Sequence, residues 1–201
     1  MKALPFIPAF SELSPEDLEG IPGLERAVEH WTDGFPAPAL WFETVRESWG
    51  APGLAARRGS EVVGFALYGP PEHFARRRRY PLPSMDEGAL LLADLEGEAR
   101  IRKHLLVRTL RELKARGAGP VEAVATAVSL PHHVDAGFLK ANGWEVVRRR
   151  GIYVLMRCEL ENTVEVGELA RGLLDRVRLP SLSGSPSPAF RAGEHRSHAA
   201  R

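Results

Sequence analysis

Apolar residues recur along residues 89–160 in a pattern that predicts alternating strands and helices. Residues 89–95 are almost continuously apolar, which is typical of a strand buried on both faces. Residues 101–115 place one isoleucine and several leucines on one side of a helix, with charged residues largely elsewhere. The rest of the pattern predicts, in order, a strand at 121–128, a short helix at 134–142, and closing strands at 144–150 and 152–160.

The first half of the chain predicts short helices followed by a hairpin. Ser14 and Pro15 have the order of a helix N-cap and first helical residue, and acidic residues follow them. Gly20 is expected to end that helix early. The further predicted elements are a helix at 24–31, a turn-rich connection at 32–38, a helix at 39–49, and a hairpin of residues 54–58 and 61–68.

The connection at residues 70–88 carries four consecutive arginines, Arg76 to Arg79. A loop of this length in a compact domain is usually functional or mobile. The arginines could bind an anion, or they could form a solvated surface run. The sequence favours the solvated run, because clusters of like charge are usually exposed.

Composition favours an ordinary soluble domain with a C-terminal extension. The chain has 201 residues, of which 44% are hydrophobic and 26% charged, and its net charge is +1. This balance gives no argument for nucleic acid or membrane as a partner. We expect one domain at residues 1–160, a helix at 161–179 and a disordered tail at 180–201. With no signal peptide and no long apolar run, a cytoplasmic protein is expected.

The order of these elements resembles the Gcn5-related N-acetyltransferase family. The local match is strongest from Phe138 to Val147, where Asn142, Gly143 and Trp144 precede the last hairpin. The resemblance implies an α/β (α+β) fold, in which a mixed, mostly antiparallel central sheet is flanked by helices. It also implies a V-shaped splay between the two central strands, with acetyl-CoA as co-substrate in the gap.

The loop expected to hold the acetyl-CoA pyrophosphate departs from the family pattern. The family places Gln or Arg, then two glycines, where this chain has Gly97, Arg100 and Arg102. Arg100, Arg102 and Lys103 could hold the phosphates with side chains instead of backbone amides. Alternatively, they are solvated charges on a helix that has lost its ligand. The cofactor-binding residues implied by the resemblance are Leu92, Asp94, Leu95, Gly97, Arg100, Arg102, Lys103 and Asn142.

The expected catalytic residues are Asp94 and His132. Leu139 stands where the family usually has the tyrosine that protonates the leaving thiolate. Asp94 could serve as a base at the end of the central strand, or it could cap the following turn. His132 could act as a base, or it could belong to a plain exposed loop. Other candidate groups are Glu96, Glu122, His133, Tyr68 and Tyr80. No metal is expected, because no carboxylate or cysteine stands at ligand spacing beside the histidines.

Two functional hypotheses follow, with a weaker third. The first is an acyltransferase that moves an acetyl group from acetyl-CoA to a primary amine of a small molecule or peptide. The second is a non-catalytic binding or regulatory module of the same fold. The third is an unrelated α+β domain, which the absence of a splay would favour. A homodimer is possible under each hypothesis. The single cysteine, Cys158, has the apolar surroundings of an inert core thiol.

Overall fold

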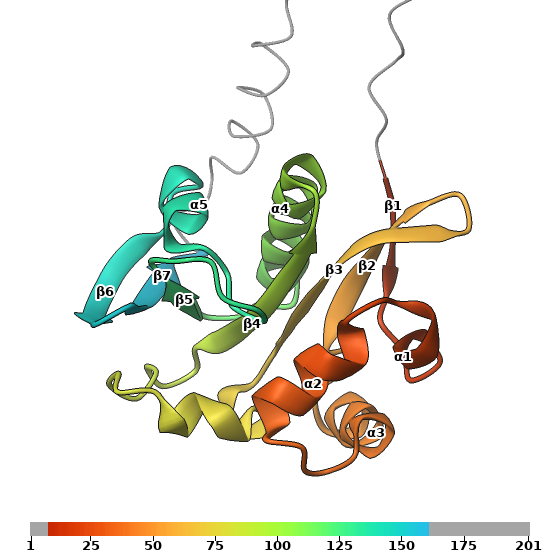
Figure 1. Ribbon diagram of the computed structural model, residues 1–201, viewed down its shortest axis with the longest axis horizontal. Helices are drawn as coiled ribbons and strands as arrows, with labels where there is room; N and C mark the ends of the chain where they lie inside the picture. Colours follow the sequence, from red (N-terminus) through yellow and green to blue (C-terminus); the bar gives the residue numbers. More distant parts are fainter. Residues whose placement is uncertain (1–7, 161–201) are drawn as a thin grey trace, which may run out of the picture. The chain divides into compact units, whose positions relative to one another are not determined.

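The computed structural model describes residues 8–160 of the chain and gives them a layered arrangement of helices around a sheet (Figure 1). The strands are β1 (Ala9–Glu12), β2 (Gly53–Arg58), β3 (Glu61–Gly69), β4 (Leu90–Gly97), β5 (Val121–Thr126), β6 (Glu145–Arg150) and β7 (Tyr153–Cys158). The helices are α1 (Asp17–Gly20), α2 (Leu24–Thr32), α3 (Pro38–Ser48), α4 (Ala99–Ala115) and α5 (Ala136–Ala141), with two short 3₁₀ helices at Pro71–His73 and Ala75–Arg79.

The sheet has seven strands in the order β1-β2-β3-β4-β5-β7-β6, and only β4 and β5 run parallel to each other. One core cluster packs the apolar side of α4 and α5 against one face of the sheet. A second cluster packs α2 and α3 against the other face. Figure 1 shows these two groups of helices on opposite sides of the sheet. The fold class predicted from the sequence is therefore confirmed.

The two central strands separate almost at once. β4 pairs with β5 only at Leu90–Val121 and Leu91–Glu122, whereas its pairing with β3 continues to Gly97. Beyond Leu91, the side of β4 that faces β5 has no strand partner among the described residues. This is the splay expected from the sequence, and it argues against the unrelated α+β domain.

A bulge in β4 sets which side chains face the two layers. Leu67 pairs with Asp94 and Tyr68 pairs with Leu92, so Ala93 is the extra residue. Directly opposed residues of a sheet share a face. Because Leu67 packs in the α2–α3 core, Asp94 faces that layer, away from α4.

Most predicted elements are present within a residue or two of the expected bounds; one strand was not predicted, and one helix begins later than expected. The short strand β1 was not predicted, because its sequence, Ala-Phe-Ser-Glu, lacks a clear apolar alternation. Helix α1 begins at Asp17 and not at Ser14; the backbone amide and hydroxyl of Ser14 instead donate to the Asp17 carboxylate. A single residue, Glu98, connects β4 to α4, so Gly97 lies in the strand and both Arg100 and Arg102 lie in the helix.

The arginine run at residues 76–79 is not a uniformly solvated surface, which corrects the favoured interpretation. Arg77 is buried, with 5% of its surface exposed. Arg76 and Arg79 both pair with Asp33, at 2.9 Å and 2.8 Å respectively. Only part of the run is therefore free to meet solvent.

Some expectations concern residues that the structure does not describe. The helix expected at 161–179 and the tail expected at 180–201 lie outside the described residues, as do residues 1–7. Within residues 8–160, every helix is too short or too polar to cross a membrane.

Gly97 is predicted to be intolerant of a side chain. Its φ is +128°, and a Cβ atom would lie 2.9 Å from the Val63 carbonyl oxygen. We expect Gly97→Ala to destabilise the protein by about 1–3 kcal/mol in denaturant unfolding. Gly20→Ala is the matched control, because no atom lies within 4 Å of its Cβ position and its φ is not positive. Equal stability of the two variants would contradict the close contact of β3 with Gly97.

Candidate functional site

Asp94 lies on the part of β4 that has separated from β5, and it forms a polar pair with His132. Asp94 is buried, and its Oδ2 lies 3.3 Å from His132 Nδ1. Its Oδ1 accepts a hydrogen bond from the Leu95 amide at 2.8 Å. Asp94 lies within β4, so it does not cap a following turn; its carboxylate contacts both the Leu95 amide and His132.

His132 is held in place from both its backbone and its ring. Its φ is +58°, which is uncommon for a residue with a side chain. Its carbonyl accepts a hydrogen bond from Trp31 Nε1 at 3.1 Å, and 22% of its side chain is exposed. The hydrogen bond with Asp94 raises the pKa of His132. The plain exposed loop considered from sequence is therefore wrong for this residue.

A series of hydrogen bonds through two further histidines, His30 and His133, lies beside this pair and joins elements far apart in sequence. Arg76 contacts His30 Nδ1 at 3.2 Å, His30 Nε2 contacts Tyr80 Oη at 3.2 Å, and Tyr80 Oη contacts His133 Nε2 at 2.8 Å. His133 Nδ1 lies 2.8 Å from the Pro131 carbonyl oxygen.

The direction of every hydrogen bond in this series follows from its two ends, the Arg76 guanidinium and the Pro131 carbonyl. Arginine only donates, so His30 Nδ1 accepts and His30 Nε2 donates to Tyr80. Tyr80 then donates to His133 Nε2, and His133 Nδ1 donates to the carbonyl of Pro131. Both histidines are neutral in this arrangement, and their bonds fix the loop that carries His132.

Burial supports the neutral state of these two histidines. Loss of hydration, followed by the positive charge of Arg76, lowers the pKa of His30 to about 4. Burial also lowers the pKa of His133. The site thus combines two histidines that resist protonation with His132, which favours it.

A cavity of about 410 Å³ opens next to His132. Its walls come from the connection between α1 and α2, from the middle of β3 and from the end of β4; the lining residues are Ile21, Pro22, Gly23, Val62, Val63, Gly64, Phe65, Glu96, Gly97 and His132. Burial, and then the charge of Asp94, raises the pKa of Glu96. Two proton-accepting side chains, Glu96 and His132, therefore face one cavity.

The first turns of α4 carry the expected phosphate-binding side chains, but on a helix and not on a loop. Arg100 is exposed, and Arg102 and Lys103 are partly buried. The Arg102 guanidinium lies 5.1 Å from the centre of the Phe138 ring, and its Nε has no hydrogen-bond partner among the described residues. The first amides of α4 remain available to an anion, as at any helix start.

Several other residues expected at the site have side chains that point elsewhere. Leu92 and Leu95 are buried in the core beneath α4, so only their backbone faces the splay. The Asn142 side chain donates to the carbonyl of Phe138 at 2.8 Å and so caps its own helix.

Two candidate groups, the Tyr68 hydroxyl and the Glu122 carboxylate, are engaged in contacts elsewhere. Tyr68 donates to Glu112 at 3.1 Å, and burial raises its pKa. Glu122 is buried beside Arg157, at 3.4 Å. Leu139 is fully buried. Burial raises the pKa of the Cys158 thiol to about 11, which agrees with an inert core cysteine.

Sequence analysis missed His30, considered Trp31 only as an aromatic that could line a pocket, and gave Tyr80 no spacing argument. His30 and Trp31 fall at the end of a predicted helix, and Tyr80 falls in the long connection. No local pattern signals that these segments meet the loop after β5. Within residues 8–160, no group of three or more histidine, cysteine or carboxylate side chains is placed to hold a metal ion.

Stability should fall as His30 is forced to protonate. Its folded pKa of about 4 lies below its ordinary value of 6.5, so the unfolded chain binds more protons between these pH values. As the pH falls from 6.5 to about 4, we expect protonation of His30 to cost the wild type about 1–3 kcal/mol of unfolding free energy. His30→Gln should flatten the pH dependence measured by urea unfolding. An unchanged slope would show that His30 is not held neutral.

The comparisons with known proteins identify the fold. Neither the protein-family models nor the curated proteins yield a match to this chain. Among solved structures, the PaiA N-acetyltransferase from Thermoplasma acidophilum, in complex with coenzyme A, is 19% identical with a TM-score of 0.52, covering 77% of this chain and 99% of its own. The ribosomal-protein-alanine N-acetyltransferase from Brucella melitensis is 20% identical with a TM-score of 0.52, covering 75% and 99%.

A third similar structure, from Salmonella typhimurium and solved with its cofactor acetyl-CoA, is 17% identical with a TM-score of 0.53, covering 78% of this chain and 95% of its own. Together with the seven-stranded sheet and its splayed centre, these similarities show that the chain has the fold of the Gcn5-related N-acetyltransferases.

Proposed function

We propose that this protein transfers an acetyl group from acetyl-CoA to a primary amine. The observation that carries the proposal is the early separation of β4 from β5, with Asp94 on the separated part of β4 and paired with His132. A gap between two strands leaves backbone donors and acceptors that an extended, amide-containing ligand can satisfy. The pantetheine arm of acetyl-CoA is a ligand of this kind.

The start of α4 supports a phosphate position next to the gap. β4 leads into α4 through Glu98 alone, so the free amides of the helix lie close to the strand. Arg100, Arg102 and Lys103 add positive charge to these amides. Coenzyme A or acetyl-CoA is bound in two of the similar structures, which supports the same co-substrate here.

The cavity beside β4 suits the acceptor amine. It lies on the α1–α2 side of the sheet, where Asp94 and Glu96 also face. The amine nitrogen attacks the thioester carbonyl carbon, the carbon–sulfur bond breaks, and the thiolate leaves. Holding the two reactants together in this way contributes much of the rate enhancement.

His132 is the proposed base. When neutral, its Nδ1–H donates to Asp94, which leaves Nε2 to accept the proton of the attacking amine. Asp94 thereby fixes the tautomer and stabilises the cation that forms. With leucine at position 139, the thiolate takes its proton from water. The acceptor class, a small-molecule or peptide amine, belongs to this proposal.

A second candidate function is a binding module without catalysis. It is favoured by one specific feature, the single-residue connection at Glu98, which replaces a glycine-rich phosphate loop. Without that loop, fewer backbone amides can surround a pyrophosphate. Ligand binding separates the two functions.

Acetyl-CoA should stabilise the protein against heat. A ligand that binds only the folded state at a hundred times its Kd adds about 2.7 kcal/mol to the free energy of unfolding. We expect a dose-dependent rise in Tm with acetyl-CoA and with CoA in a thermal-shift assay. Replacing Arg100 and Arg102 by Gln should weaken the shift, and Arg108→Gln, on an exposed later turn of α4, should not. No shift at millimolar ligand would exclude the acetyltransferase and leave the binding module.

The pH dependence of acetyl transfer should report Asp94. The rate should rise with pH as His132 loses its proton, because only the neutral imidazole can accept the proton of the amine. Asp94 raises the pKa of His132 and so places this rise at higher pH. In Asp94→Asn that limb should move to lower pH, with maximal kcat reduced about a hundredfold. The assay follows CoA release with the best amine from a panel of primary amines and peptides.

Asp86→Asn, which removes an exposed carboxylate from the connection before β4, is the control and should leave the limb in place. An Asp94→Asn profile identical to the wild type would mean that His132 is not the base.

A further inference from the structure

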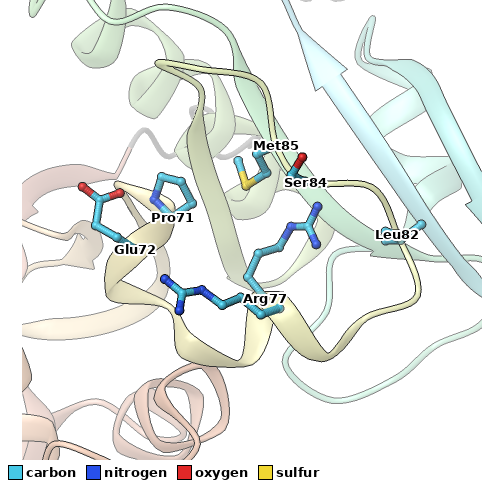
Figure 2. A pocket seen from close by; sticks show the side chains of 7 residues that line it. Pro71, Glu72, Arg77, Leu82, Ser84 and Met85 are labelled. Atoms are coloured by element: carbon cyan, nitrogen blue, oxygen red, sulfur yellow. The ribbon is translucent and has the colours of Figure 1, made fainter.

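A second cavity, of about 440 Å³, lies within the connection between β3 and β4. We call it the arginine pocket; its lining residues are Pro71, Glu72, Arg77, Arg78, Leu82, Ser84 and Met85. None of them lines the cavity beside His132. Figure 2 shows Pro71 and Glu72 on one side of the pocket and Ser84 and Leu82 across from them. The size is typical of a site for a small organic molecule.

Arg77 brings a buried charge to this pocket and makes no ion pair within residues 8–160. It is 95% buried, since 5% of its surface is exposed. Its Nη2 donates to the Pro83 carbonyl, and its Nε has no hydrogen-bond partner among the described residues. Burial lowers the pKa of Arg77, which shows that its surroundings disfavour the charge. A buried cation in this state gains from an oxyanion.

The buried carboxylate of Glu122 attracts the charge of Arg77 but forms no ion pair with it. Glu122 is itself fully buried, and its Oε2 has no hydrogen-bond partner among the described residues. Its Oε1 lies 3.4 Å from Arg157 and not beside Arg77. Burial, and then the charge of Asp86, raises the pKa of Glu122. The charge of Arg77 is therefore only partly balanced by the fold.

The fold divides the four arginines of the run into two pairs with different surroundings. Arg76 and Arg79 pair with Asp33. Arg77 and Arg78 instead line the pocket. Arg78 is exposed and makes no ion pair within residues 8–160. Two guanidinium groups lining one pocket favour a carboxylate as the ligand.

The remaining lining residues limit what the ligand can be. Glu72 also lines the pocket, so its negative charge and the two arginines together leave one net positive charge. That charge matches a monoanion better than a dianion such as a phosphate monoester. Pro71, Leu82 and Met85 supply apolar surface for the body of the ligand.

We propose that the arginine pocket binds a small monocarboxylate with an apolar body, whose carboxylate contacts Arg77 and Arg78. The apolar body lies against Pro71, Leu82 and Met85. This site is separate from the proposed acetyl-transfer site and does not depend on that activity.

The test is a titration of the full chain, labelled with nitrogen-15, followed by backbone amide NMR. The probes are hexanoate, 1-hexanol and inorganic phosphate. We expect saturable shifts with hexanoate, centred on the amides of residues 71–85, and no saturable shift with hexanol. Phosphate should bind more weakly than hexanoate.

Matched variants at neighbouring arginines locate the contact. Arg78→Gln should weaken hexanoate binding about tenfold, because it removes one charged hydrogen-bond donor. Arg79→Gln alters another exposed arginine, which pairs with Asp33 and does not line the pocket, so it should leave the affinity unchanged. Arg77→Met should abolish binding; if that variant does not fold, the probe panel and the Arg78 variant decide the matter.

Three results would overturn the proposal. The first is the absence of saturable shifts at residues 71–85 with hexanoate. The second is equal binding of hexanol, or stronger binding of phosphate than of hexanoate. The third is unchanged affinity in Arg78→Gln. Acetyl-CoA binding is measured on the same sample, and we expect its affinity to be the same with and without hexanoate and in the Arg78→Gln variant.

Discussion

β4 stays beside β5 for only two residue pairs, and the rest of the site follows from this separation. Because β4 still pairs with β3 as far as Gly97, the strand remains rigid while its other side is left open. The bulge at Ala93 turns Asp94 toward the layer of α2 and α3. The chain after β5 can then return across the gap, where Thr126 bridges to Asp135 and His132 reaches Asp94.

Such a separation exposes polar backbone and buries polar side chains, and both are unfavourable unless partners are found. The buried groups near Asp94 have found them. Trp31 donates to the carbonyl of His132, and the chain from Arg76 through His30 and Tyr80 to His133 has a donor and an acceptor at every step. A network with one consistent direction specifies a single loop conformation. The positive φ of His132 is maintained by these contacts.

Elements with a regular pattern could be predicted from the sequence, and long-range contacts could not. The apolar run of β4, the leucine face of α4 and the Gly59 turn are local signals, so their elements were correctly placed. The sequence shows that the family's glycines are missing around Glu98, but it does not show that Gly97 belongs to the strand and Arg100 to the helix. Asp94 and His132 were named from their places after strands. His30 and Tyr80 could not be found in this way, since only the tertiary fold brings them within hydrogen-bond distance of one another.

The same limit explains the arginine run. Four identical residues carry no sequence signal that distinguishes them, yet the turn of a 3₁₀ helix directs Arg76 and Arg79 to Asp33 and places Arg77 in the interior. A buried cation is energetically unfavourable, and Arg77 is buried beside a cavity in which a ligand could balance its charge.

The central claim is that the open side of β4 receives the pantetheine of acetyl-CoA. Amide hydrogen exchange tests it directly, because unpaired strand amides exchange quickly and become protected when a ligand bonds to them. Coenzyme A is predicted to slow exchange in residues 92–96 and in the first turn of α4, with little change in the Gly53–Arg58 strand. Unchanged exchange in residues 92–96 at saturating coenzyme A would contradict the claim.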